Sequence, residues 1–533
     1  MSIQRHTVAT NIPLLAALVA EGFGILTIKT EPVPATRTPC FLLFSLDTTG
    51  SMDEGTGAQG VSKLDYVKST FRNMLRYLAT LSETSEIYIK VNRFDYDVAT
   101  VIDLVRVTNA NVNVLIERIQ QLSADGLTAL DKPLQLAAAT ISEYATSNPT
   151  HTAVHIFMTD GTPTAGESRT ANLVQLVDDH FINVFVGYGS NHNADLMRQC
   201  SAKEKASYLF IDNAEDTSLF YGEALHQILY PAISNVTIRA TSSDGGASSS
   251  EGEGQIYNWK TNTWSNELRE DVIIGDCTKT YHVKSNPNAL LTFELHGIDH
   301  TRDPIPQEPG FIEEIDEVPH LIDTESGEPE TVDLTNYMFR QLVLEKLFKA
   351  TSYSTLTGQE KRIYRESLEE LFRVMRRSMR ERGLDDDPFM LRLCDDIKVT
   401  HSTLNSQVGL MYTMARQSSQ GRQQLFSPSN RPVDADEEER TLTRAGPARY
   451  GRMFDDDDDE RAQPTYLTNA PNQQNRADPS NHSDHSFRSD ATTEVPEGFV
   501  VEDELAHFVT EERDQSCYAT PAILDTVRQL SQP

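Results

Sequence analysis

Short apolar runs alternate with amphipathic stretches over residues 41–230, and this alternation constrains the fold more than any other feature of the sequence. The first run, residues 41–46, is almost continuously apolar, as in a parallel strand that is buried on both faces. The amphipathic stretches have helical spacing, for example at Leu64 and Val67. Strands that alternate with helices form a parallel sheet with helices on both faces. We therefore predict a doubly wound α/β domain over residues 36–231.

Within this domain each element is placed by its own pattern. The expected strands are residues 41–46, 87–94, 98–105, 154–158, 182–186 and 208–211. The expected helices begin near residue 64 and then cover residues 110–122, 130–146, 168–179, 193–202 and 216–229.

Polar residues follow the first strand, at the edge of the sheet where open α/β folds bind ligands. Asp47, Thr49 and Ser51 stand two residues apart there, so a carboxylate and two hydroxyls can converge on one point. Thr128 lies between two helical patterns, and Asp160 follows a later apolar strand. Hydroxyl and carboxylate oxygens with no Cys or His nearby suit a hard cation such as Mg²⁺.

The order of these five residues, each after its expected element, resembles the metal-ion-dependent adhesion site (MIDAS) of von Willebrand factor A domains, here of the intracellular type. The resemblance covers roughly residues 36–231. It implies that the hydroxyls bind Mg²⁺ or Mn²⁺ and that the two aspartates act directly or through water. It also implies an open coordination position for an exposed Asp or Glu of a protein partner. The other interpretation, ordinary turn and cap residues, fits any one triplet alone better than three in register.

Residues beside the five ligands are expected to frame the contact with the partner. They are Met52, Asp53, Gly126, Leu127, Gly161 and Thr162. Asp53 and Glu54 could hold a second ion, although two acids that open a loop are more often solvated.

The segments on either side of the α/β domain have a strand pattern of a different kind. Residues 232–300 contain short runs with strict alternation, as at residues 291–295, which indicates an antiparallel β-sandwich. Residues 1–35 contain one isolated strand pattern at 22–34, and an isolated strand needs a partner. We predict that it joins the sandwich, so that the α/β domain is inserted into the sandwich.

The C-terminal part has three regions. Residues 301–332 are acidic and proline-bearing and indicate a linker, and amphipathic patterns over residues 333–426 predict a small bundle of three helices. Residues 427–533 carry 23 acidic and 10 basic residues without periodicity, which predicts a disordered acidic tail. Two apolar islands in this tail, at 498–501 and 522–530, either bind partners or fold back on the core.

Composition limits the partners and the compartment. The formal net charge of −32 argues against nonspecific binding to nucleic acid or to anionic membranes. Arginines crowd residues 373–382, but acidic residues within reach favour a solvated helix face over a docking patch. The five cysteines are scattered and never form C-x-x-C, as in a protein of a reducing compartment. An apolar run at residues 12–20 is either a weak secretory signal or a packed helix, and we favour the helix. No run has transmembrane length, so we expect a cytoplasmic protein.

Three functions are compatible with these patterns. The first is a divalent-metal-dependent protein interaction module, an adaptor or scaffold in an intracellular complex without enzymatic activity. The second is a Mg²⁺-dependent phosphohydrolase of the haloacid-dehalogenase type, because residues 47–51 faintly resemble its nucleophile loop and Asp276 could supply a late acid. That family needs a further acid after the Gly-Asp pair, where this chain has Cys277. The third is an assembly scaffold that recruits partners through its helices and tail.

Overall fold

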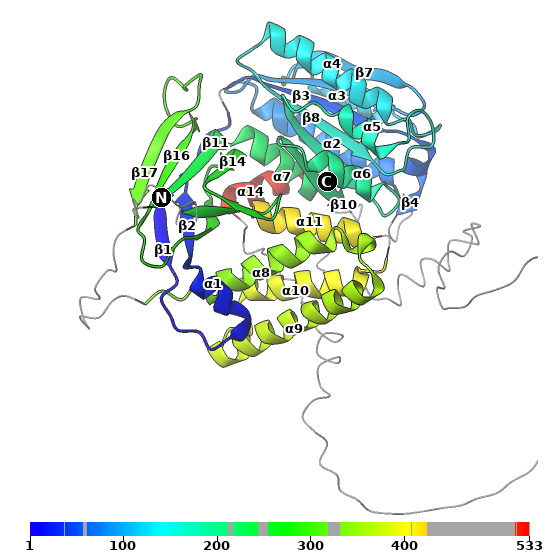
Figure 1. Cartoon of the computed structure of the whole chain (residues 1–533). Helices are drawn as coiled ribbons and strands as arrows, with labels where there is room; N and C mark the ends of the chain where they lie inside the picture. Colours follow the sequence, from blue (N-terminus) through cyan, green and yellow to red (C-terminus); the bar gives the residue numbers. More distant parts are fainter. Residues whose placement is uncertain are drawn as a thin grey trace, which may run out of the picture. The chain divides into compact units, whose positions relative to one another are not determined.

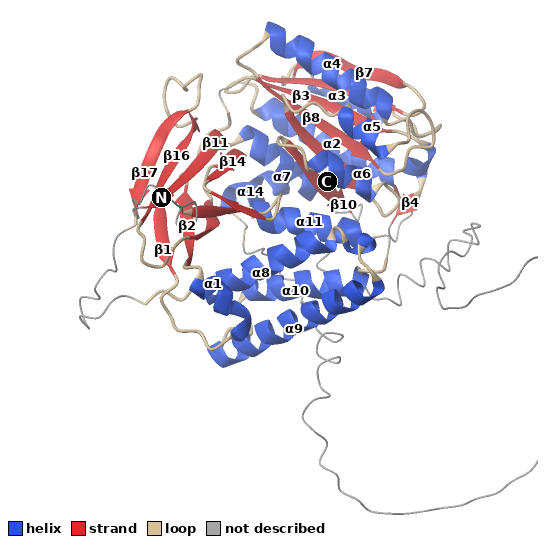
Figure 2. Cartoon of the chain, in the orientation of Figure 1, coloured by secondary structure: helices blue, strands red, loops and turns tan. Residues whose placement is uncertain are grey.

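A six-stranded sheet lies at the centre of residues 40–211 (Figures 1 and 2). The computed structural model describes residues 1–36, 38–56, 61–211, 217–242, 254–317, 331–406, 408–423, 518 and 520–531. The strand order is β10-β9-β8-β3-β6-β7. The strands are β3 (Cys40–Asp47), β6 (Ile87–Phe94), β7 (Val98–Arg106), β8 (Thr152–Thr159), β9 (Ile182–Tyr188) and β10 (Ala206–Ile211).

The sheet confirms the predicted α/β fold except at one edge. All neighbouring strands are parallel apart from β6 and β7, which are antiparallel. Only residues 95–97 connect β6 to β7. So short a connection allows a hairpin but not the crossover that a parallel strand requires.

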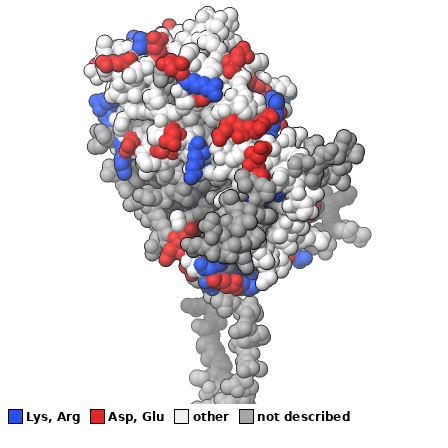
Figure 3. All heavy atoms as spheres, turned by 90° about the vertical axis from the view of Figure 1, so that its left-hand side faces the viewer, with Lys and Arg blue, Asp and Glu red and all other residues white. Residues whose placement is uncertain are grey.

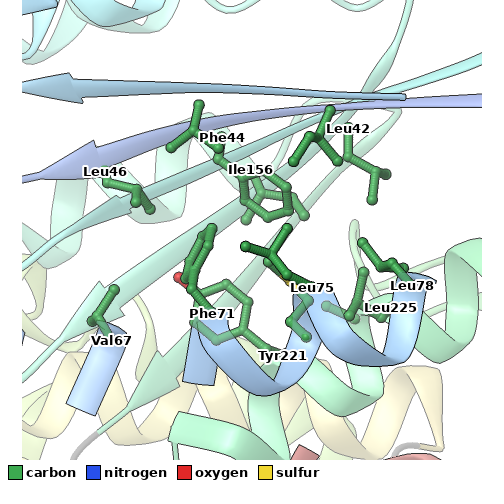
Figure 4. Packing of buried hydrophobic residues seen from close by; sticks show 14 of the residues in the cluster. Leu42, Phe44, Leu46, Val67, Phe71, Leu75, Leu78, Ile156, Tyr221 and Leu225 are labelled. Atoms are coloured by element: carbon green, nitrogen blue, oxygen red, sulfur yellow. The ribbon is translucent and has the colours of Figure 1, made fainter. Parts of the chain in front are cut away.

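Helices cover both faces of the sheet, and the alternating side chains of β3 pack against both layers. Leu42 and Phe44 belong to a core that they share with α2 (Lys63–Thr80), α3 (Val112–Gln120) and α7 (Thr217–Leu229). Figure 4 shows this core, where the Phe44 ring lies 4.9 Å from the Phe71 ring, centroid to centroid. On the opposite face Phe41 packs with α4 (Asp131–Ser147), beside α5 (Thr170–Gln175) and α6 (Ala194–Ser201).

Two antiparallel sheets form the predicted sandwich. One has the order β1-β2-β15-β12-β13 and the other β14-β11-β16-β17. The strands are β1 (Ser2–Arg5), β2 (Phe23–Lys29), β11 (Pro231–Ser242), β12 (Gln255–Asn258), β13 (Thr263–Ser265), β14 (Glu267–Ile274), β15 (Thr278–Lys284), β16 (Leu291–Asp299) and β17 (Gly310–Asp316). Their inner faces share one core, to which Leu26, Ile238 and Phe293 contribute. Because β2 precedes the α/β domain and β11 follows it, the domain is inserted into the sandwich as predicted.

The linker predicted over residues 301–332 is wrong in part. Residues 310–316 form β17, which pairs with β16 and packs Ile312 and Ile315 against the sandwich core. Glu313 and Glu314 make the strand look like linker in the sequence, and both are exposed. Charged residues are common on an edge strand because they discourage pairing with other chains.

Within the described residues 331–406 and 408–423 there are four α-helices, rather than the predicted three: α8 (Thr335–Ala350), α9 (Gly358–Arg382), α10 (Pro388–Thr403) and α11 (Gly409–Arg422). The sequence analysis missed α10, which begins with Pro388 after an Asp387 side chain that accepts from the Met390 amide at 2.8 Å. Proline at the first position and aspartate at the cap are a standard helix start. The helix α11 packs on α8 and α10 of the bundle and also places Met411 and Met414 against the α/β domain.

The predicted disorder of the whole tail is wrong for its C-terminal end. Residues 521–530 form α14 (Pro521–Leu530), which packs on α7 and α2 and is drawn in red beside α7 in Figure 1. The Leu530 side chain is fully buried, and Asn73 Nδ2 donates to the Leu530 carbonyl at 2.7 Å. The apolar island at 522–530 therefore folds back on the core. The other island, at 498–501, lies outside the described residues.

The N-terminal apolar run is a packed element. Residues 13–15 form a 3-10 turn and α1 (Ala16–Ala20) follows, with Leu15 and Leu18 buried. Within the described part of the chain, no helix combines the length and the apolarity that crossing a bilayer requires. On the face of the molecule shown in Figure 3, the visible acidic and basic side chains are interspersed.

Candidate metal centre

Three loops meet at the carboxyl edge of the central sheet. Asp47 is the last residue of β3 and Asp160 follows β8 directly. These strands are parallel neighbours, with Leu46 opposite Met158, so their ends lie together. The third loop is tied to the first, because the Asp125 amide donates to the Thr48 carbonyl at 2.8 Å. The fold therefore brings all three predicted ligand segments to one place.

The spacing of the oxygens matches that of ligands on a small octahedral cation. Ser51 Oγ donates to Asp160 Oδ1 at 2.7 Å and lies 3.1 Å from Thr49 Oγ1. Adjacent ligands on Mg²⁺, each about 2.1 Å from the ion, are about 3 Å apart. These three oxygens could therefore occupy neighbouring corners of one coordination octahedron.

The Thr128 hydroxyl lies on the same side of Gly161 as the Ser51 hydroxyl. A Cβ atom added to Gly161 would lie 3.4 Å from Thr128 Oγ1 and 4.0 Å from Ser51 Oγ, both ordinary van der Waals distances. An ion bound by both hydroxyls would have to lie between them.

Asp47 is fully buried and oriented by two donors. Its Oδ1 accepts from the Thr49 amide at 2.9 Å, and its Oδ2 accepts from Thr159 Oγ1 at 2.6 Å. Burial and the nearby Asp160 raise the pKa of Asp47 to about 6, against the opposing effect of the two hydrogen bonds. The charged carboxylates of Asp47 and Asp160 repel each other, so a bound cation would stabilise their charged forms.

A lysine that the sequence analysis missed completes the centre. Lys63, the first residue of α2, donates from Nζ to Asp160 Oδ2 and to Glu54 Oε2, both at 2.8 Å. Burial disfavours its charge, but Asp160 and Glu54 outweigh that effect and the pKa of Lys63 is raised. The lysine is therefore an ammonium. Glu54, suggested in the sequence analysis for a second ion, is its ion-pair partner instead.

The predicted contact rim is accessible except for one residue. Asp53, Gly126 and Thr162 are exposed, Gly161 is partly exposed, and 53% of Leu127 is exposed. Met52 is wrong as a rim residue, because its side chain is fully buried in the core under α2. Tyr96, which the sequence analysis missed, is 60% exposed in the loop between β6 and β7.

The donor set fits a hard cation of the Mg²⁺ type. Among the described residues, no group of three or more His, Cys, Asp or Glu side chains could hold a metal ion, so a centre at these loops would have to rely on hydroxyl and water ligands as well. The candidate centre has two carboxylates and three hydroxyls, which suits an ion that keeps several water ligands and takes few from the protein. Soft or imidazole-preferring metals would find neither sulfur nor nitrogen ligands among these five residues.

Asp276, the late acid considered for a phosphohydrolase, lies away from the three ligand loops. The Asp276 amide donates to the Glu31 carbonyl at 3.0 Å, so Asp276 lies in the sandwich and not beside Asp47. Asp276 also lines a cavity of 590 Å³ between the α/β domain, the sandwich and α14. None of the five predicted ligands lines that cavity.

Comparison with known proteins identifies the domain that carries this centre. A family model of the von Willebrand factor type A domain matches residues 42–162, which include all five predicted ligands. Residues 42–162 are a von Willebrand factor type A domain. Domains of this type are commonly metal-dependent interaction modules. The chain as a whole matches no curated protein.

Solved structures resemble the chain at low identity. A von Willebrand factor type A protein from Catenulispora acidiphila is 13% identical, with 74% of this chain and 96% of that chain covered and a TM-score of 0.47. The ArnB paralog VWA2 from Sulfolobus acidocaldarius is 14% identical, with coverages of 78% and 97% and a TM-score of 0.43. Proximal thread matrix protein 1 of the mussel byssus, with a zinc-occupied MIDAS motif, is 15% identical over 34% of this chain and 46% of that chain, with a TM-score of 0.28. Likenesses this distant carry no argument about function.

Proposed function

We propose that the von Willebrand factor type A domain binds Mg²⁺ or Mn²⁺ at a MIDAS formed by Asp47, Thr49, Ser51, Thr128 and Asp160. An exposed Asp or Glu of a protein partner then completes the coordination of the ion. The chain acts in this way as an adaptor or scaffold within a complex, and it catalyses no reaction. The bound ion supplies a compact positive charge for the partner's carboxylate.

The convergence of the hydroxyl and carboxylate oxygens carries this proposal. Ser51 Oγ lies within 3.1 Å of both Thr49 Oγ1 and Asp160 Oδ1. Asp47 lies behind them, held by Thr159 and by the Thr49 amide. A partner that contacts the ion would also meet the exposed Leu127 and Thr162, which flank the ligand loops. An ion contact of this kind works at short range, and salt screens the repulsion by the acidic chain beyond about 8 Å.

Partner capture tests the proposal. The full chain is immobilised and exposed to cell extract in Mg²⁺ or in EDTA, alongside the Asp47→Ala and Ser51→Ala variants. Ser142→Ala is the matched control, because Ser142 is an exposed serine on α4 of the same domain. We expect partners that are captured by the wild type and Ser142→Ala in Mg²⁺ and lost in EDTA and in both ligand variants. Capture that survives EDTA and both ligand substitutions would refute the proposal.

Recruitment through the acidic tail can be separated from recruitment through the ion. Tyr518 Oη donates to Gln420 Oε1 at 2.7 Å, so the two described ends of the segment 424–517 lie close together. Deletion of residues 433–507 therefore leaves a connection long enough to keep α14 in place. The ion-dependent proposal predicts an unchanged set of partners after this deletion. Loss of every partner would favour the tail.

We also propose a reducing, intracellular compartment. Among the described residues, Cys40, Cys200, Cys277 and Cys394 form no disulfide, and Cys517 lies outside the described residues. Disulfides form and persist in oxidising compartments, so this usage of cysteine favours the interior of the cell.

A further inference from the structure

Lys63 and the expected ion share one carboxylate. Lys63 Nζ donates to Asp160 Oδ2 at 2.8 Å, whereas Asp160 Oδ1 accepts from Ser51 Oγ at 2.7 Å on the side of the hydroxyl ligands. The lysine side chain is only 7% exposed and the aspartate side chain is fully buried. Solvent therefore screens this ion pair little.

Neither carboxylate of the centre can offer both oxygens to one cation without competition from hydrogen-bond donors. In Asp160, Oδ2 faces the ammonium of Lys63, so an ion would be bound through Oδ1, which also accepts from Ser51 Oγ. In Asp47 each oxygen already accepts one hydrogen bond, from the Thr49 amide or from the Thr159 hydroxyl, which leaves each oxygen one lone pair for an ion or a water ligand. Ca²⁺ favours six to eight oxygen ligands and commonly takes a carboxylate in bidentate fashion, whereas Mg²⁺ takes single oxygens in an octahedron. The arrangement of donors thus disfavours the larger ion.

The charge of Lys63 also opposes any divalent cation. Asp47 and Asp160 bring two negative charges to the centre, and the buried ammonium compensates one of them. Glu54 compensates the ammonium only partly, because its side chain is 57% exposed and is screened by water. A bound divalent cation therefore leaves a net positive charge among the buried groups, which a carboxylate from outside would neutralise.

We propose that Lys63 is a positioning residue that keeps Asp160 a single-oxygen ligand, selects Mg²⁺ and Mn²⁺ against Ca²⁺, and lowers the affinity of the centre for every divalent cation. This inference rests on the proposed function, because it concerns the same ion. It implies that the ion is held most firmly when an acidic residue of the partner is bound.

Lys63→Met tests the proposal, because methionine keeps the length of the side chain and removes its charge. Mn²⁺ binding to the full chain is measured by the electron paramagnetic resonance signal of free Mn²⁺, and Ca²⁺ is then added as competitor. We expect Lys63→Met to bind Mn²⁺ at least about tenfold more tightly, about 1.4 kcal/mol. Because Asp160 Oδ2 is released, the affinity for Ca²⁺ should increase more than the affinity for Mn²⁺, so the preference for Mn²⁺ over Ca²⁺ should fall.

The matched control is Lys90→Met. Lys90 lies in the middle of β6, and the substitution removes the same charge from its ion pair with Asp103 of β7. This control should leave Mn²⁺ affinity and the Mn²⁺/Ca²⁺ preference unchanged. A second variant, Glu54→Gln, changes a side chain that is 57% exposed and keeps its shape. It should weaken Mn²⁺ binding, because the ammonium loses its outer partner and acts more strongly on the ion.

The outcomes separate this inference from the proposed function. If neither the wild type nor Lys63→Met retains Mn²⁺, the metal centre itself is refuted and the inference with it. If the wild type binds Mn²⁺ but Lys63→Met binds it no more tightly, or keeps the same preference over Ca²⁺, only the inference is overturned. Should Lys63→Met fail to fold, unchanged or tighter Mn²⁺ binding by Glu54→Gln would also overturn it.

Discussion

Single side chains determine how the candidate metal centre is built. The carboxylate of Asp47 is held by Thr159 and the Thr49 amide, and the carboxylate of Asp160 is held by Ser51 and Lys63. Each donor fixes one oxygen in place. Ligands that are oriented in this way lose less conformational freedom when an ion binds.

Replacing the hydroxyl of Thr128 tests one predicted ligand. Thr128→Val keeps the shape of the side chain and puts a methyl group where the oxygen was. We expect Mn²⁺ affinity to fall at least about tenfold, the size of effect seen when groups around a metal are altered. Thr162→Val is the control, since Thr162 is an exposed threonine in the neighbouring loop and should leave ion affinity unchanged. Equal affinities of the two variants, in calorimetric titration, would exclude Thr128 as a ligand.

Removing the donor behind Asp47 tests the orientation of the first aspartate. Thr159→Val deletes the 2.6 Å hydrogen bond to Asp47 Oδ2 and leaves a buried carboxylate oxygen without that partner. We expect a loss of about 1–3 kcal/mol in the free energy of unfolding, measured with urea. Thr48→Val is the comparison, because the Thr48 hydroxyl donates to a carbonyl that also accepts from the Thr48 amide. A loss no greater than that of Thr48→Val would contradict this role of Thr159.

The sequence pointed to the loops of the candidate centre but not to Lys63. Asp47, Thr49 and Ser51 alternate along one loop, and Asp160 follows a recognisable strand, so linear spacing was informative about these segments. Lys63 acts through a long side chain that reaches across from the start of α2. Its role depends on how the helix packs, which no local pattern encodes. Met52 was misplaced for the same reason, because burial under α2 is a tertiary property.

Among the elements, α14 shows most clearly where sequence patterns fail. It is only ten residues long, and an isolated helix of this length is not stable in water. It forms because its apolar side chains pack on α7 and α2. A Cβ atom at Gly222 of α7 would lie 3.0 Å from Val527 Cγ2, so α7 has a glycine where α14 comes closest. The long strands of the central sheet were predicted because their pattern is local and strong.

Truncating the last buried side chain of α14 measures how much this helix contributes. Leu530 is fully buried in the core of the von Willebrand factor type A domain. Leu530→Ala should lower the free energy of unfolding by about 2–5 kcal/mol, as for other buried leucines. Arg528→Ala on the same helix is the control, because the Arg528 side chain is 75% exposed and its loss should cost little. Equal unfolding midpoints in urea would show that α14 does not belong to the cooperative unit.

For the whole molecule, buried histidines make stability depend on pH. His155, His192 and His226 are buried, and burial lowers the pKa of each to about 4. Between pH 6.5 and about 4 the unfolded chain therefore binds more protons than the folded chain, so stability falls as the pH falls through this range. Each histidine contributes about 1.4 kcal/mol per pH unit there. The raised pKa values of Asp47, about 6, and of Glu345 and Asp396 act in the opposite direction, whereas the lowered pKa values of His282, His300 and His401 add to the effect of the three histidines.

Urea unfolding at pH 7 and pH 5 checks this dependence. We expect the wild type to be less stable at pH 5, and His155→Gln to show a smaller difference between the two pH values. His180→Gln should behave as the wild type, because the side chain of His180 is 94% exposed. A free energy of unfolding that rises from pH 7 to pH 5 would contradict this role of the buried histidines. So would a His155→Gln variant that loses as much stability between the two pH values as the wild type does.

We propose that one hard cation lies between the hydroxyls of Thr49, Ser51 and Thr128 and the carboxylate of Asp160. Crystals of the full chain grown in Mn²⁺ test this directly, through anomalous difference density collected near the manganese absorption edge. We expect a peak within coordination distance of Ser51 Oγ and Thr128 Oγ1, at the carboxyl edge of the central sheet. Well-ordered loops without a peak between these oxygens, or a manganese ion bound only elsewhere, would contradict it.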